Sequence, residues 1–187
     1  MARGLLPITA VAVLALGVGA ARADFVNPGF ETGTFSGWTL TGNTGFSGIT
    51  NDPAVVHSGN FAAVFGAVGS LTFLSQTVSD TAGLTYTVGG WLRNNAGIPN
   101  EFDIEVNGVP RLDLLNLPAQ NYTREAVTFV GTGSDTITFS FRQDSSFFEF
   151  DDAFINAVPE PASLAIFGTA LAGLGLMRRS RRRRTEG

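Results

Sequence analysis

The chain has 187 residues, a formal net charge of −4, 23 glycines, 16 phenylalanines and no cysteine. Without cysteine it has no disulfides, no thiolate metal sites and no cysteine nucleophile. Residues 24–157 hold four arginines against fourteen carboxylates, and their net charge of −10 excludes a nucleic-acid partner, because such a surface repels phosphates.

The first 23 residues have the pattern of a secretory signal peptide. Arg3 gives a positive start, a mostly apolar run follows from Leu5 to Val18, and Ala21-Arg22-Ala23 has the small-x-small form of a signal-peptidase site. An uncleaved membrane anchor is the alternative, and the peptidase-site pattern argues against it. We therefore expect cleavage before Asp24 and export of the segment that follows.

Residues 24–157 consist of short β-forming segments separated by polar turns, without a sustained helical period. Segments 70–78 and 84–92 are rich in β-formers, and apolar residues alternate at 102–106 and 137–141. Asn107-Gly108 is a strong hairpin signal. The pattern predicts one all-β domain, an antiparallel β-sandwich or jelly roll. Asp103 and Glu105 share the polar face of their strand, and we expect that face to be solvated.

No set of residues in this domain indicates catalysis. His57 is the only histidine, and no Ser/His/Asp spacing indicates a triad. A glycosidase needs two positioned carboxylates, but among fourteen acids a pair such as Asp103 and Glu105 arises easily by chance. We therefore expect a protein that is not an enzyme.

Four segments of the domain carry a family resemblance. In chain order they are NPGFETGTFSGW (27–38), HSGNFAAVF (57–65), LSQTVSDTAGLTYTVGGWLR (74–93) and FFEFDDAFI (147–155). Together they resemble the galactose-binding-like jelly roll of several carbohydrate-binding module families. The resemblance covers nearly the whole domain and implies a noncatalytic sugar-binding module.

The same resemblance implies a structural calcium ion where the first and last strands meet. Calcium takes six to eight hard oxygen ligands, mixing carboxylates with backbone carbonyls. The implied ligands are the Gly29 carbonyl, the Glu31 carboxylate, a carbonyl at Asn60 or Phe61, and the Asp151 carboxylate, with Asp152 as a ligand or an exposed neighbour. Ser58 stands where some relatives have an acidic ligand, which weakens the expected affinity or removes the site. Alternatively, Glu31 and Asp151 are ordinary surface carboxylates.

Sugar-binding modules stack sugar rings on exposed aromatic side chains and bond the hydroxyls with amides and arginines. The candidate ligand-binding residues are Arg93, Asn94, Asn95, Tyr122, Arg142, Gln143, Phe147 and Phe148. An aromatic residue on an alternating strand is more often core, and this alternative applies to Phe148 in particular. Trp38 and Trp91 fall where the family has packing aromatics, so we expect both in the core.

The C-terminal segment 158–187 differs from the acidic domain before it. Val158-Pro159-Glu160-Pro161 precedes the uncharged run 162–177, and six arginines follow between residues 178 and 184. The run spans about 24 Å as a helix, a short membrane span, and the arginines are expected on the cytoplasmic side. These parts resemble the PEP-CTERM sorting signal of bacterial proteins. The resemblance implies recognition by a membrane exosortase and removal of the tail.

These features predict an exported protein that passes through the inner membrane to the cell surface or extracellular matrix. The domain is expected to bind polysaccharide of an exopolysaccharide matrix without catalysis. The alternative is a structural matrix protein that self-associates and binds no sugar. Exposed aromatics beside amides would favour the first function, and an apolar patch or an open edge strand the second.

Overall fold

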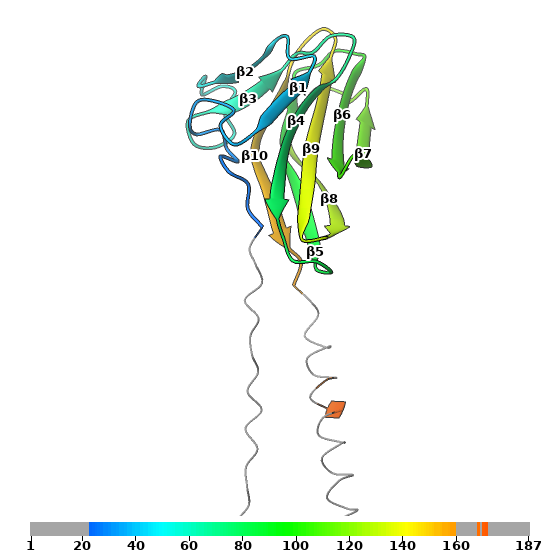
Figure 1. Cartoon of the computed structure of the whole chain (residues 1–187). Coiled ribbons are helices and arrows are strands. Elements are labelled where there is room, and N and C mark those ends of the chain that lie inside the picture. The colour runs from blue at the N-terminus through cyan, green and yellow to red at the C-terminus, as the bar shows by residue number, and fades with distance from the viewer. Residues whose placement is uncertain (1–22, 160–167, 169, 172–187) are drawn as a thin grey trace, which may run out of the picture.

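The computed structural model describes residues 23–159, 168, 170 and 171, in which two antiparallel five-stranded sheets pack face to face (Figure 1). The first sheet has the order β1 (Thr39–Gly42), β4 (Thr72–Ser79), β9 (Ser134–Gln143), β6 (Asn100–Val106) and β7 (Val109–Leu115). The second has the order β2 (Ser47–Thr50), β3 (Ala62–Phe65), β10 (Phe148–Ala157), β5 (Thr85–Asn94) and β8 (Gln120–Val130). The predicted antiparallel β-sandwich is confirmed.

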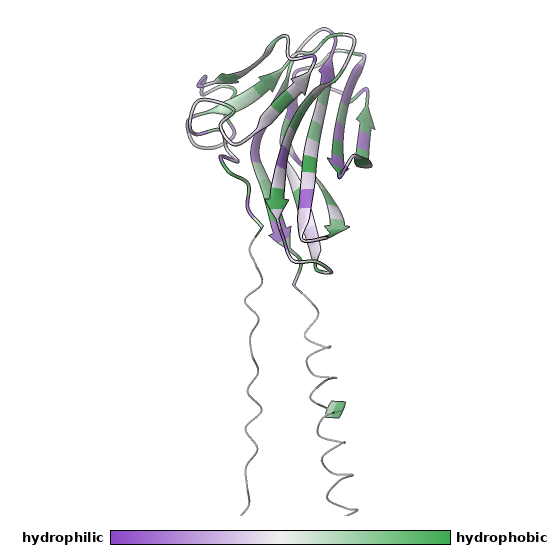
Figure 2. Cartoon of the chain, in the orientation of Figure 1, coloured by the Kyte–Doolittle hydropathy of each residue, from purple (hydrophilic) through white to green (hydrophobic). Residues whose placement is uncertain are grey.

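Phenylalanine rings from both sheets fill the space between them. Apolar and polar residues alternate along the strands, as the banding in Figure 2 shows, because successive side chains point to opposite faces. Phe65 of β3 stacks on Phe141 of β9 with 3.9 Å between ring centroids, and Phe139 lies 4.7 Å from Phe150 of β10. Trp38 is buried among these rings, as predicted.

Local turns follow the sequence signals. Asn107 and Gly108 join β6 to β7, both with positive φ (54° and 71°), which is the backbone of a type I′ hairpin turn. The predicted strands at 70–78 and 84–92 correspond to β4 and β5. The hairpin and both strands are therefore confirmed.

The predicted solvated face of β6 is wrong at one position. Glu105 points outward as expected, but Asp103 is only 7% exposed. The strand lies inside its sheet, with β7 on one side and β9 on the other, so neighbouring side chains cover the Asp103 carboxylate. Alternation identified the outward face, but not how deeply that face is covered.

The two predicted sorting segments lie largely outside the described residues. Residues 1–22 and most of the predicted membrane run 162–177 are not described; residues 168, 170 and 171 of that run are helical. Among the described residues, no helix is long and apolar enough to cross a membrane. The first described residues and the end of β10 lie toward the same end of the sandwich (Figure 1).

Candidate functional site

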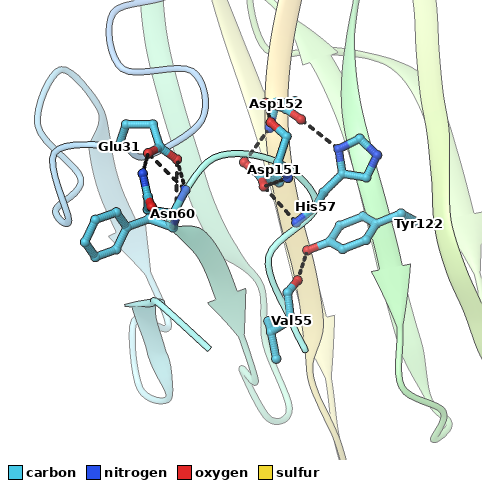
Figure 3. Close-up of polar contacts among 9 residues, drawn as sticks. Glu31, Val55, His57, Asn60, Tyr122, Asp151 and Asp152 are labelled. Carbon is cyan, nitrogen blue, oxygen red and sulfur yellow. Dashed lines mark hydrogen bonds and ion pairs between the residues drawn. The ribbon is translucent and has the colours of Figure 1, made fainter. Parts of the chain in front are cut away.

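A bulge in β10 presents two neighbouring carboxylates at one edge of the sandwich. The pairing of β10 with β5 shifts between Asp151 and Phe154, and Asp152 has a positive φ of 47°. The Asp151 Oδ2 atom accepts hydrogen bonds from the backbone amides of His57 and Ser58, both at 3.1 Å (Figure 3). Asp152 accepts one from the Ser58 hydroxyl at 2.9 Å and contacts His57 Nδ1 at 2.7 Å. The loop 51–60 is thus tied to the last strand.

A third carboxylate joins the same loop from the N-terminal segment. Glu31 accepts hydrogen bonds from the backbone amides of Asn60 at 3.0 Å and Phe61 at 3.2 Å (Figure 3). A Cβ atom at Gly29 would lie 3.3 Å from Asp152 Oδ1, 3.6 Å from Asp151 Oδ1 and 3.8 Å from Glu31 Cγ. The Asp151 and Asp152 carboxylates and the Cγ atom of Glu31 therefore lie around Gly29, and we call Glu31, Asp151 and Asp152 the carboxylate cluster.

The electrostatics of the carboxylate cluster suit a cation. Burial raises the pKa of Asp151 to about 6, and the negative charge of Asp152 acts in the same direction. The backbone hydrogen bond from Asn60 lowers the pKa of exposed Glu31 and keeps it charged. The seven implied calcium positions, which are Gly29, Glu31, Ser58, Asn60, Phe61, Asp151 and Asp152, all lie in this region. Their oxygen atoms are the hard donors that calcium prefers.

Beside the carboxylate cluster, aromatic side chains and a histidine lie on the outer face of the second sheet. The His57 ring stacks on Trp91 of β5 at 4.4 Å and lies 4.9 Å from Tyr122 of β8. The Tyr122 hydroxyl donates a 2.7 Å hydrogen bond to the Val55 carbonyl (Figure 3). Burial raises the pKa of Tyr122, with the charges of Asp151 and Glu149 adding to it, so the phenol stays neutral.

The position of Trp91 corrects the sequence prediction. Trp91 was expected in the core, but it is half-buried on the outer face, where the loop 51–60 covers part of it. The residues on either side of it, Gly90 and Leu92, point into the core instead. The alternation of side chains along β5 places Trp91 on the outer face, where His57 of the loop packs against it.

A polar pocket lies at the end of β5 on this sheet. It has a volume of about 300 Å³ and is lined by Arg93, Asn94, Asn95, Ala119, Gln120 and Asn121. Glu149 of β10 lies 3.3 Å from Arg93 Nε and accepts a hydrogen bond from the Asn95 amide, which orients both side chains. The Gln120 Nε2 atom is buried without a hydrogen-bond partner in the described part of the chain. The pocket thus holds a guanidinium, two exposed amides and one unused donor.

Of the predicted ligand-binding residues, Arg93, Asn94 and Asn95 meet at this pocket, and Tyr122 lies next to it on β8. The Asn94 side chain is buried, where it donates to the Leu117 carbonyl at 2.7 Å, so it shapes the pocket wall. Phe147 is 39% exposed and its carbonyl accepts a hydrogen bond from the backbone amide of Asn95, but its ring lies against Gly66, on the β3 side of β10 and away from the pocket.

The other three predicted ligand-binding residues are placed elsewhere. Phe148 and Gln143 are fully buried between the sheets, where Gln143 donates to Asn94 Oδ1 at 2.7 Å, so neither is accessible to a ligand. Arg142 lies on the outer face of the first sheet, paired with Asp144 at 2.7 Å. The predicted set therefore divides between two faces and the core.

Sequence reasoning missed Gln120, Asn121 and Glu149. Gln120 and Asn121 directly precede Tyr122, and two amides next to a candidate aromatic residue were a usable signal. Glu149 lies between buried Phe148 and Phe150, and the alternation of β10 places it on the outer face beside Arg93.

Comparisons with known proteins find likenesses for the C-terminal tail and for the sandwich domain. Residues 157–183 match the PEP-CTERM protein-sorting motif. The tail is a PEP-CTERM sorting signal. Such a signal marks the chain for export and for sorting through the membrane to the cell surface. A search of curated proteins finds no significant match to the chain.

Among solved structures, the sandwich resembles carbohydrate-binding modules. TmCBM61, solved with β-1,4-galactotriose, is 26% identical with a TM-score of 0.61, covering 72% of this chain and 99% of that one. The CBM22-1 xylan-binding domain of Paenibacillus barcinonensis Xyn10C is 15% identical with a TM-score of 0.51, covering 77% and 100%. An arabinose-bound GH51 arabinofuranosidase is 12% identical with a TM-score of 0.55, covering 75% and 27%. The fold is a jelly roll that resembles those of carbohydrate-binding modules.

Proposed function

We propose that the chain is an exosortase substrate whose sandwich domain binds polysaccharide at the cell surface or in the extracellular matrix, without catalysis. The observation that carries the proposal is the polar pocket at the end of β5, where Arg93, Asn95 and Asn121 gather. The likeness to a module solved with a galactose oligosaccharide supports this ligand class.

The position of the pocket relative to the sorting tail supports the proposal. Phe148, at the start of β10, pairs with Asn94 beside the pocket, whereas Ala157, at the end of β10, pairs with Tyr86. Nine residue steps of strand separate these two ends, about 30 Å at 3.3 Å per residue. A protein held by its tail would therefore present the pocket on the side away from the membrane.

The chemistry of the pocket matches sugar hydroxyls. Amides and a guanidinium offer donors and acceptors in a small space, and the unpaired Gln120 Nε2 donor gains a partner when a hydroxyl enters. Tyr122, two residues after Gln120 on β8, provides aromatic surface beside the pocket. The Arg93–Glu149 contact fixes the guanidinium before binding, which lowers the entropy lost on association.

Affinity electrophoresis of the full chain in detergent, in gels containing β-1,4-galactan or xylan, tests the proposal. We expect a retained wild type, and Gln120→Ala and Asn121→Ala variants about five- to tenfold weaker, since each loses a hydrogen bond of about 1 kcal/mol. Asn156→Ala is the matched control, because Asn156 is an exposed amide at the far end of β10. Retention of both pocket variants equal to that of the wild type would contradict the proposed binding site.

We also propose that calcium occupies the carboxylate cluster as a structural ion. Glu31, Asp151 and carbonyls of the 57–61 loop would hold it, and the ion would join the N-terminal segment, this loop and β10. Thermal unfolding in calcium and in EDTA tests this, because a ligand at a hundredfold excess over its Kd stabilises by about 2.7 kcal/mol. The expected calcium-dependent rise in Tm should be smaller in Glu31→Gln than in the wild type. An equal rise in the variant would exclude this site.

A further inference from the structure

A second group of carboxylates lies on the opposite side of the sandwich, on the outer face of the first sheet. Oxygen atoms of Glu101, Asp103 and Asp113 all lie within 4.8 Å of one another. Asp103 pairs directly with Asp113 of β7 across the strand ladder, and Glu101 precedes it on the same face of β6. We call these three residues the β6–β7 carboxylates.

Two buried oxygen atoms at this group, one of them within it, have no hydrogen-bond partner in the described part of the chain. One is Oδ1 of Asp103, a side chain that is more than nine-tenths buried, and the other is the hydroxyl of fully buried Ser140. Ser140 lies directly opposite Asp103 on β9, so both side chains point to the same face. Ser140 is not an acid, and its hydroxyl is an independent unpaired oxygen on the same face as Asp103.

The charge at this point is balanced only in part by a protein cation. Arg142 lies opposite Glu101 on the strand ladder and its charge acts on that carboxylate, but its ion pair is with Asp144 at 2.7 Å. Burial and the neighbouring charges of Glu101 and Asp113 raise the pKa of Asp103 to about 7, so its charged form is disfavoured while no cation is bound. A positive ion between the three carboxylates would turn their repulsion into attraction and would satisfy both unpaired oxygens.

The structure provides access for such an ion. A depression of about 570 Å³ on the same face is lined in part by Phe73, Glu101 and Arg142. Phe73 pairs with Ser140 across the ladder, and Arg142 pairs with Glu101, so the depression adjoins the β6–β7 carboxylates. It leaves room for the water molecules that complete a coordination shell.

We propose that the β6–β7 carboxylates and Ser140 form a binding site for a hard divalent cation, calcium. All donors are oxygens, three carboxylates supply up to six of them, and calcium accepts six to eight ligands in flexible geometry. Zinc is disfavoured because it prefers nitrogen and sulfur ligands, and magnesium because it requires near-ideal octahedral geometry. The ion would fix the edge hairpin β6–β7 to β9, on the face of the sandwich opposite the carboxylate cluster.

Calorimetric titration of calcium into the chelator-treated full chain, in detergent at pH 7.5, tests the proposal. We expect a binding event that persists in Glu31→Gln, which alters only the carboxylate cluster. It should weaken at least tenfold in both Asp103→Asn and Asp113→Asn. Two variants are needed because Asp103 is buried, whereas Asp113 is exposed and its substitution leaves the core unchanged.

Glu105→Gln is the matched control, because Glu105 lies on the same face of β6 but outside the group of three. It removes one negative charge without removing a proposed ligand, so its calcium affinity should stay near that of the wild type. Weakening in Glu105→Gln equal to that in Asp113→Asn would show diffuse charge attraction and overturn the site. Loss of all calcium binding in Glu31→Gln, or unchanged binding in both aspartate variants, would also overturn it.

Discussion

Two buried aspartates make the stability of the domain depend on pH. Asp80 follows β4 and is 8% exposed, and Asp135 in β9 is fully buried. Burial, reinforced by Asp135, raises the pKa of Asp80 to about 6. Burial also acts to raise the pKa of Asp135, but hydrogen bonds from Asp80, Thr132 and Asn107 lower it overall. When the pair holds a proton, that proton therefore resides on Asp80.

The sign and size of the effect follow from this pKa. Between pH 4 and 6 the folded chain keeps a proton on Asp80 that the unfolded chain has lost, so stability falls as pH rises through this range. Above pH 6 the full penalty is present. The rise from 3.8 to about 6 corresponds to about 3 kcal/mol at most. In Asp80→Asn the amide replaces the proton permanently, and the penalty disappears.

Chemical unfolding of the full chain, followed by circular dichroism at pH 4 and pH 7.5, measures the difference. We expect Asp80→Asn to be more stable than the wild type by about 1–3 kcal/mol at pH 7.5, and equal within about 0.5 kcal/mol at pH 4. Asp52→Asn removes the same charge from an exposed turn and should change little at either pH. A stability difference for Asp80→Asn that is the same at both pH values would refute the shared-proton account.

Two further predictions concern packing, and both are checked by denaturant unfolding. A Cβ at Gly89 would collide with the Glu125 carbonyl of β8, so Gly89→Ala should lower the free energy of unfolding by about 2 kcal/mol or more. Gly83 has free space around it but a φ of 86°, so Gly83→Ala should lower the free energy of unfolding by about 1 kcal/mol. Equal costs would contradict the clash. Phe141→Ala removes a fully buried ring stacked on Phe65 and should cost about 3–5 kcal/mol, and a loss below 1 kcal/mol would contradict its central place in the core.

Local patterns were sufficient to predict the strands at 70–78, 84–92, 102–106 and 137–141, and the inward faces of the last two. The alternation at 102–106 and 137–141 identifies core residues because side-chain direction in a strand depends only on the neighbouring residues. The hairpin at Asn107-Gly108 is equally local, because it requires two residues that tolerate positive φ. These predictions needed no knowledge of the strand order.

The burial of residues on the outer faces of the sheets could not be predicted from alternation. Asp103 is buried because β7 and β9 flank it, and β9 lies more than thirty residues further along the chain. Trp91 is half-buried because His57, from a distant loop, stacks on it. Both outcomes depend on long-range pairing, which alternation does not encode. The calcium ligand set came from an ordered family resemblance, not from spacing, and calcium binding itself stays a prediction.

One loop connects the carboxylate cluster to the polar pocket. Its His57 and Ser58 amides bind Asp151, while its Ala54 carbonyl accepts a 2.8 Å hydrogen bond from Arg93, a residue of the pocket. An ion at the carboxylate cluster would restrict this loop and so restrict Arg93. Sugar binding to the ordered pocket would then lose less conformational entropy.

We therefore expect calcium to strengthen polysaccharide binding, by about fivefold, the low end of ordinary coupling, because other hydrogen bonds already hold the loop. The measurement compares the retention of the full chain in galactan gels with calcium and with EDTA, for the wild type and for Glu31→Gln. The calcium effect should be present in the first and absent in the second. Coupling is reciprocal, so galactan must raise calcium affinity by the same factor, and a calcium affinity that galactan leaves unchanged would show that the loop does not link the two sites.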